Sequence, residues 1–207
     1  MWQPRPARGN LLSEIESPAL AAEVASRGHF RYESGHHGDL WLDLDALLVD
    51  ARRARGWASA LAQTAAGCQP EVVCGPLIGG AFVAQLLAAE IGAGFVFAER
   101  LVCEGRTTRY RVPDSLRKAV SGRRVLLVDD AINAGSALLA TLTDLSRCRA
   151  RLAGLACLIV LGETASQIAE QNGVPLYRLG SLERGMWAAE DCPLCAAGTP
   201  LIDRAAT

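Results

Sequence analysis

From residue 72 onward, short apolar runs alternate with stretches in which apolar residues recur at helical spacing. The apolar runs at 72–74, 93–100, 125–128, 155–161 and 176–179 have the length of strands, and glycine-containing loops follow several of them. Strands that alternate with helices predict a parallel sheet whose two faces are both covered. Ligands of such sheets bind beyond the carboxyl ends of the strands, where the glycine loops fall.

The first third of the chain has a different pattern. Residues 11–27 show helical spacing, and residues 50–66 do so again. Between them, 29–32 and 39–43 predict two short strands around Ser34-Gly35, which form a hairpin-like excursion. We find no linker or repeat, so residues 1–207 are expected to form a single domain.

Composition narrows the class of protein. Half of the residues are hydrophobic and the net charge is -1, which is typical of a globular chain and gives no support for nucleic-acid binding. The longest apolar run has strand length, so no membrane span is expected. The first ten residues lack the apolar core of a secretory signal, which favours the cytoplasm. The seven cysteines are scattered, which favours reduced thiols.

The loop after residues 125–128 carries the clearest chemistry. The apolar run leads directly into Asp129 and Asp130, and Ala134-Gly135-Ser136 follows at the predicted start of a helix. Backbone N–H groups at 134–137 would suit a phosphate, and Gly135 would allow its close approach. Carboxylates suit sugar hydroxyls or a hard cation. A ribose 5-phosphate would satisfy both ends of the loop.

Four segments resemble one known family. "VLLVDDAINAGSA" resembles the signature of type I phosphoribosyltransferases, which bind 5-phosphoribosyl 1-pyrophosphate (PRPP), and "VVCGPLIGGAFVA" resembles their pyrophosphate loop. "GHFRYESGHHGDLWLDLDAL" and "FVFAER" resemble segments of the orotate phosphoribosyltransferase branch. The resemblance implies an α/β fold with a parallel sheet flanked by helices. It also implies a small hood segment at about 28–45, a flexible lid at about 101–115 and a C-terminal arm at about 180–207.

The resemblance implies that a nitrogen nucleophile replaces pyrophosphate at ribose C1, with Mg²⁺ accompanying PRPP. The implied PRPP-binding residues are Asp129, Asp130, Ala131, Ile132, Asn133, Ala134, Gly135, Ser136 and Ala137. The implied pyrophosphate loop consists of Gly75, Pro76, Leu77, Ile78, Gly79 and Gly80. The implied catalytic residues are Asp129 and Asp130 with the lid cations Arg100, Arg106 and Arg109, because arginine binds phosphate well.

The chain departs from the orotate pattern at positions that could face the base. Glu33 and Glu163 stand where orotate enzymes have a lysine and an arginine, which argues against an acceptor that carries a carboxylate. The alternative is that both glutamates face solvent. His36 and His37 could contact the base, the lid or the pyrophosphate. We therefore expect a nucleobase-like acceptor other than orotate.

Cys192 and Cys195 form a lone Cys-x-x-Cys near the C-terminus. A zinc site usually needs two further ligands, and no second close pair of cysteines exists. A second subunit could supply them, or His29 with a distant cysteine. The alternative is that the motif packs the C-terminal arm.

Two further expectations concern partners. The resemblance implies a homodimer, because lids of the orotate branch reach into the partner's site. A non-catalytic protein that senses PRPP or a nucleotide on the same fold is the alternative to an enzyme, since a fold does not fix a function. A structural zinc-binding interaction protein is a third possibility.

Overall fold

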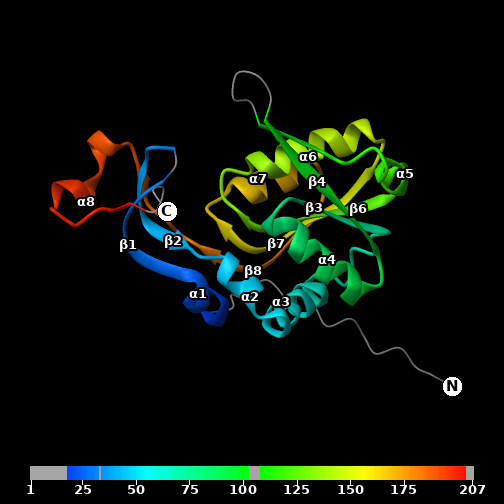
Figure 1. Cartoon of the computed structure of the whole chain (residues 1–207), viewed down its shortest axis with the longest axis horizontal. Coiled ribbons are helices and arrows are strands. Elements are labelled where there is room, and N and C mark those ends of the chain that lie inside the picture. Colours follow the sequence, from blue (N-terminus) through cyan, green and yellow to red (C-terminus); the bar gives the residue numbers. More distant parts are fainter. Residues whose placement is uncertain (1–17, 33, 103–107, 204–207) are drawn as a thin grey trace.

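The computed structural model describes residues 18–32, 34–102 and 108–203. They form a six-stranded sheet with helices on both faces, and a separate four-stranded sheet at one side (Figure 1). Within these residues, no helix is both long enough and apolar enough to cross a bilayer. The expected α/β class with a parallel sheet flanked by helices is confirmed.

The larger sheet has the strand order β5-β4-β3-β6-β7-β8. All neighbours pair in parallel except β4 and β5, which form an antiparallel hairpin. The strands are β3 (Val72–Pro76), β4 (Gly94–Val102), β5 (Thr108–Arg111), β6 (Arg124–Ile132), β7 (Arg151–Leu161) and β8 (Leu176–Leu182). The apolar residues 125–128 of β6 are fully buried because helices cover both faces of this central strand.

Two groups of helices cover the larger sheet. One hydrophobic cluster joins it to α3 (Ala51–Thr64) and α4 (Gly79–Ile91), and a second joins it to α5 (Arg117–Val120), α6 (Ser136–Arg147) and α7 (Thr164–Gln171). The side chain of Asp50 caps α3 by accepting hydrogen bonds from the N–H groups of Arg52 and Arg53, at 2.9 and 3.3 Å. The predicted helix at 50–66 is thus confirmed to within two residues at its C-terminal end.

The smaller sheet has the order β10-β1-β2-β9, and we call it the hood sheet. Its strands are β1 (Ala25–Arg31), β2 (His37–Leu42), β9 (Met186–Trp187) and β10 (Ile202–Asp203). The short helices α1 (Pro18–Val24) and α2 (Asp45–Val49) flank the hairpin in sequence, while η2 (Ala189–Asp191) and α8 (Pro193–Ala196) lie between β9 and β10. Two segments distant in sequence, residues 25–42 and 186–203, therefore build the hood (Figure 1).

Two sequence predictions about this region need correction. The helix expected at 11–27 ends at Val24, because the chain enters β1 at Ala25 and pairs with β2; residues 11–17 lie outside the described part. The expected hood at 28–45 is incomplete by itself. Two edges of its hairpin need backbone partners, and the C-terminal arm supplies them through β9 and β10.

Candidate active site

The two glycine loops meet at the carboxyl edge of the larger sheet. β3 and β6 are parallel neighbours in the register Cys74↔Leu127, so their loops emerge side by side. A β-carbon on Gly79 would lie 1.9 Å from Oδ2 of Asp130, and one on Gly80 would lie 2.6 Å from Oδ1 of Asp129. Only residues without a side chain allow this approach. The predicted pyrophosphate loop therefore lies directly against the predicted ribose-binding carboxylates.

Asp129 and Asp130 are held by their own backbone. The N–H of Asp130 donates to Oδ1 of Asp129 at 3.0 Å, and the N–H of Ala131 donates to Oδ1 of Asp130 at 2.7 Å. Burial raises the pKa of both carboxyls, and the neighbouring Asp130 raises that of Asp129 further. No basic side chain of the described residues forms an ion pair with either one. The pair is therefore suited to hydroxyl donors or a cation.

The start of α6 forms the other end of the loop. Gly135 adopts a left-handed conformation, with φ 70° and ψ 11°, and the helix begins at Ser136. The N–H groups of its first turn have no partners within the helix, which makes this end an anion site. A β-carbon on Gly135 would lie 2.6 Å from Cδ1 of Ile168 in α7. Glycine is thus favoured here by its backbone conformation and by packing on α7, and the close approach of a phosphate stays a prediction.

The other predicted PRPP-binding residues have different surroundings. Ile132 is 1% exposed and belongs to the hydrophobic core, so only its backbone can face a ligand. The side-chain oxygen of Asn133 accepts a hydrogen bond from the guanidinium of Arg184, in the turn between β8 and β9. Arg184 connects the hood side of the molecule to the loop. Sequence analysis missed it, although it follows the carboxyl end of a parallel strand, which is where ligand-binding residues gather.

The predicted pyrophosphate loop is shorter than the sequence suggested. Gly75 and Pro76 belong to β3, and α4 begins at Gly79, which leaves Leu77 and Ile78 between them with a cis peptide bond. The N–H of Leu77 is already used, because it donates to the carbonyl of Ala98 at 2.9 Å. At the start of α4, Ala81 and Phe82 donate their N–H groups to the carbonyl of Ile78, at 3.1 and 3.4 Å, so the N–H groups of Gly79 and Gly80 are the candidate donors.

The segment predicted to be a lid includes part of the antiparallel pair of β4 and β5, in which Arg100 is opposite Tyr110 and Arg109 is opposite Leu101. Burial raises the pKa of the Tyr110 hydroxyl, Arg100 lowers it, and Asp129 and Asp130 raise it. Tyr110 therefore lies near both Arg100 and the carboxylate pair. Arg106 lies outside the described residues.

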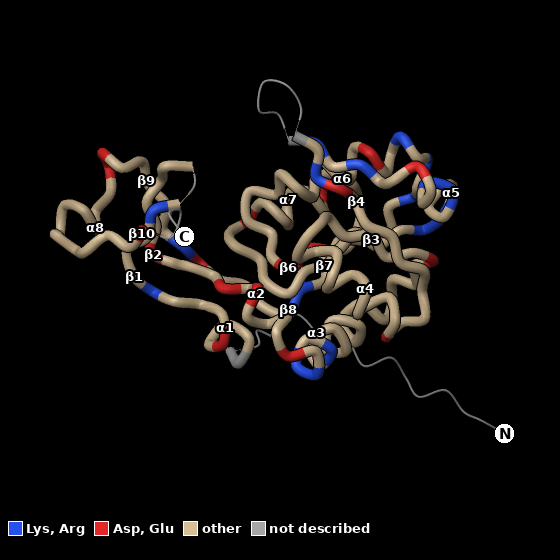
Figure 2. The backbone as a smooth tube through the Cα atoms, in the orientation of Figure 1, with Lys and Arg blue, Asp and Glu red and all other residues tan. Residues whose placement is uncertain are grey.

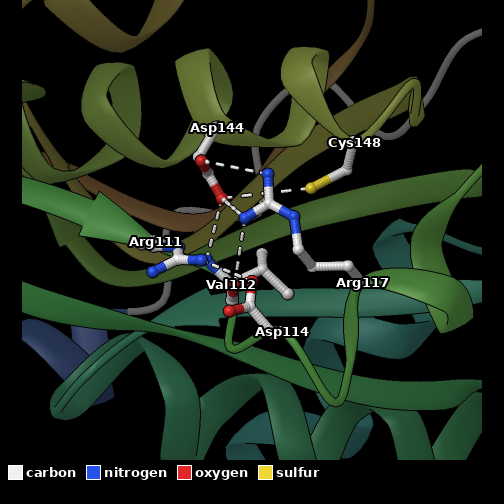
Figure 3. A network of polar contacts seen from close by, with 6 residues as sticks. All are labelled: Arg111, Val112, Asp114, Arg117, Asp144 and Cys148. Atoms are coloured by element: carbon white, nitrogen blue, oxygen red, sulfur yellow. Dashed lines mark hydrogen bonds and ion pairs between the residues drawn. The ribbon is translucent and has the colours of Figure 1, made fainter.

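Arg109 and Tyr110 both line a cavity of about 740 Å³ between the hairpin and α6. Other arginines border the same cavity, namely Arg111, Arg117 and Arg147, and basic residues gather around α5 in Figure 2. At its wall, the buried Asp144 accepts hydrogen bonds from the N–H of Val112 at 2.9 Å and from Arg117 at 3.1 Å (Figure 3). This network ties the end of the lid hairpin to α6.

The predicted base contacts that the structure describes have different surroundings. Glu33 lies outside the described residues. His36 is exposed, with its Nδ1 3.2 Å from the Ser34 hydroxyl, and Glu163 is exposed at the start of α7. His37 is only 6% exposed, and its Nδ1 lies 3.3 Å from the Sγ of Cys195 inside the hood.

This arrangement defines a class: an α/β protein with two glycine loops at the carboxyl edge of its parallel sheet, which suits a phosphorylated ligand. The sequence model of the family "Phosphoribosyl transferase domain" matches residues 43–174. The chain therefore belongs to the phosphoribosyltransferase family, in its PRPP-dependent type I class.

Relatives point to one branch of this family. The orotate phosphoribosyltransferase of Wolinella succinogenes is 28% identical over 199 residues, covering 91% of this chain and 94% of that protein. The orotate phosphoribosyltransferase of Pelotomaculum thermopropionicum is 30% identical over 175 residues, covering 84% and 87%. The crystal structure of orotate phosphoribosyltransferase from Aeropyrum pernix has a TM-score of 0.64 at 20% identity, covering 79% of this chain and 92% of that one.

The raised carboxyl pKa values predict a pH-dependent cost to stability. Between about pH 4, where a free aspartate titrates, and its raised folded pKa, the folded chain retains protons that the unfolded chain has released. Stability contributed by the protonated pair is therefore lost as pH rises through this window. Asp129→Asn keeps the acceptor for the Asp130 N–H and removes the charge. We expect it to raise the melting temperature of the ligand-free protein at pH 8, by an amount that shrinks toward pH 4.

Thermal melting followed by circular dichroism checks this expectation. Glu170→Gln, which neutralises an exposed carboxylate of α7, is the control and should give little change at either pH. A lower melting temperature for Asp129→Asn at pH 8 would contradict the account of a charge buried at a cost.

Proposed function

We propose that this chain transfers ribose 5-phosphate from PRPP to a ring nitrogen of orotate and releases pyrophosphate. The new bond joins ribose C1 to the nitrogen of the base, and the C1–O bond to pyrophosphate breaks. The observation that supports the proposal most is the direct contact between the Gly79-Gly80 turn and the Asp129-Asp130 pair. It brings candidate sites for pyrophosphate, ribose and 5-phosphate together at one edge of the sheet.

Each part of PRPP has complementary groups in this arrangement. The first-turn N–H groups of α6 would hold the 5-phosphate, and those of α4 would hold pyrophosphate. Asp129 and Asp130 would accept hydrogen bonds from the ribose hydroxyls. The transition state resembles an oxocarbenium ion, so the buried carboxylates would also favour its positive charge. Of the lid arginines, we assign Arg100 to balance the negative charge of the leaving pyrophosphate.

Magnesium fits the same donors. The two carboxylates offer hard oxygen ligands beside the loop that would receive pyrophosphate. When bound with PRPP, Mg²⁺ would neutralise part of the leaving group's charge. The role of this chain is to orient the sugar and to exclude water when the lid closes, because water would otherwise attack C1.

The names of the relatives favour orotate as the acceptor, in place of the non-orotate base expected from Glu33 and Glu163. The strength of that expectation depended on a closed, low-dielectric pocket. Glu163 is exposed at the start of α7, where solvent screens its charge and weakens any repulsion of a carboxylate.

Arg184 offers a positive charge in place of the lysine and arginine that orotate enzymes have where this chain has Glu33 and Glu163. Its guanidinium binds Asn133 of the PRPP loop, and its Nε is buried without a hydrogen-bond partner among the described residues. A buried donor that lacks a partner carries a cost that a ligand carboxylate would remove. We assign Arg184 as the group that recognises the orotate carboxylate.

A homodimer in the cytoplasm remains part of the proposal. The lid hairpin stands at the edge of the larger sheet, since β5 is a terminal strand of it. Its basic residues could therefore reach the site of a second copy, as the resemblance to the orotate branch implies.

Gly79→Ala tests the contact between the two loops. The added methyl group would displace the Asp130 carboxylate, so one charge-assisted hydrogen bond of about 1.5–3 kcal/mol should be lost and PRPP affinity should fall roughly tenfold or more. Isothermal titration calorimetry with PRPP and Mg²⁺ measures the change. Gly56→Ala in α3 is the matched control, because its β-carbon would meet no atom within 4 Å. Equal affinity of the two variants would refute the assignment.

The acceptor is tested by pyrophosphate release at saturating PRPP and Mg²⁺. We expect orotate to give a kcat/KM at least about tenfold above that of adenine, an amino-bearing base without a carboxylate. Preference for adenine would instead favour the non-orotate base expected from Glu33 and Glu163 over the orotate named in the relatives. PRPP binding without turnover of any base would favour the sensing alternative.

The same assay tests Arg184. Arg184→Gln should raise the KM for orotate by about tenfold through loss of a charge-assisted contact and leave the KM for PRPP nearly unchanged. Arg178→Gln, at an exposed position of β8, is the control. A change confined to the KM for PRPP would instead make Arg184 a support for the phosphate loop.

A further inference from the structure

Four metal-ligating side chains meet in the hood, far apart in sequence and outside the site described above. His29 lies on β1, His37 on β2, and Cys192 and Cys195 lie on either side of the start of α8. Their nearest nitrogen and sulfur atoms all lie within 4.8 Å of one another. Figure 1 shows how the fold achieves this, because the C-terminal arm carries α8 back beside the β1–β2 hairpin.

Four of the six spacings between these atoms are close to those of a tetrahedral metal site, and all six are within 4.8 Å. Zn²⁺ binds nitrogen at about 2.0 Å and sulfur at about 2.3 Å, which places neighbouring donors of a tetrahedron roughly 3.3–3.8 Å apart. In the hood, Nε2 of His29 lies 3.1 Å from Nδ1 of His37, 3.4 Å from Sγ of Cys192 and 3.7 Å from Sγ of Cys195. The Sγ of Cys195 lies 3.3 Å from Nδ1 of His37.

The protonation of His29 supports the same conclusion. Its Nδ1 lies 2.9 Å from the carbonyl oxygen of Thr199, which can only accept, so Nδ1 carries the proton. The lone pair of Nε2 then points at the other three groups. A ligating histidine commonly donates its second ring N–H to a backbone carbonyl in this way. His29 and His37 are 1% and 6% exposed, so water cannot readily satisfy them.

We propose that His29, His37, Cys192 and Cys195 bind one structural Zn²⁺ ion that fastens the C-terminal arm to the hood hairpin. Two thiolates and two imidazoles in a tetrahedron suit zinc. Four protein ligands leave no open position for a substrate, so the site is structural. All four come from one chain, so no second subunit is needed to complete it.

The small size of the hood gives this ion a physical purpose. β9 and β10 have two residues each, and Ile202 and Met186 within them are exposed. Such short, exposed strands contribute little hydrophobic stabilisation. A metal that joins β1, β2 and α8 supplies cross-links that apolar packing does not, because its binding energy is available only to the folded arrangement.

Metal analysis of the full-length protein tests the proposal. After dialysis against EDTA to remove loosely bound ions, plasma mass spectrometry should find about one zinc per chain. Cys192→Ser and Cys195→Ser should each lose most of it, while Cys68→Ala should keep it, because Cys68 is a buried cysteine outside the cluster. Wild-type protein without zinc, with iron in its place, or with a Cys192–Cys195 disulfide would overturn the assignment.

A second measurement needs no variant. The wild-type chain, unfolded to remove zinc and refolded with Co²⁺, should show the visible ligand-field bands of a tetrahedral ion and a thiolate-to-cobalt charge-transfer band. The weak absorption of octahedral Co²⁺ would contradict the proposed ligands. Neither readout depends on transferase activity, so the zinc proposal and the function proposal can fail separately.

Discussion

The structure depends on one close approach, in which the first two residues of α4, Gly79 and Gly80, lie directly against the carboxylates of Asp129 and Asp130. Parallel pairing of β3 with β6 brings the two loops to the same edge, and the missing side chains of the glycines let them touch. The result is a buried pair of like charges with no basic partner among the described residues. Such a pair is costly in the free protein, and the cost falls when hydroxyl groups or a cation reach it.

The hood side of the molecule also contacts this site. Arg184 reaches from the turn between β8 and β9 to Asn133, so the arm that completes the hood sheet also contacts the PRPP loop. A zinc ion bound by His29, His37, Cys192 and Cys195 would fix that arm to the β1–β2 hairpin. The proposed metal site and the proposed acceptor site would then be linked mechanically, because α8 and Arg184 belong to the same C-terminal segment.

The larger sheet could be predicted because its signals are local: buried strands of apolar residues, each followed by a glycine loop and a helical period. The "VLLVDDAINAGSA" segment also indicated the family, while the ribose and phosphate roles of its residues stay predictions. The hood was harder, since β9 and β10 have two residues each and pair only through contacts distant in sequence. Arg184 was missed for the same reason. His29 was named as a possible ligand of the cysteine pair, but His37 was expected at the base, the lid or the pyrophosphate and not beside the cysteines. The packing of Gly135 against Ile168 of α7 could not be foreseen, because the sequence of one loop does not show which helix lies beside it.

A crystal structure of the chain with PRPP and Mg²⁺ would test the central claim most directly. The account predicts the ribose hydroxyls on Asp129 and Asp130, the 5-phosphate on the first turn of α6, and the pyrophosphate beside the Gly79-Gly80 turn. PRPP bound elsewhere, for example in the arginine-lined cavity beside α6, would contradict it.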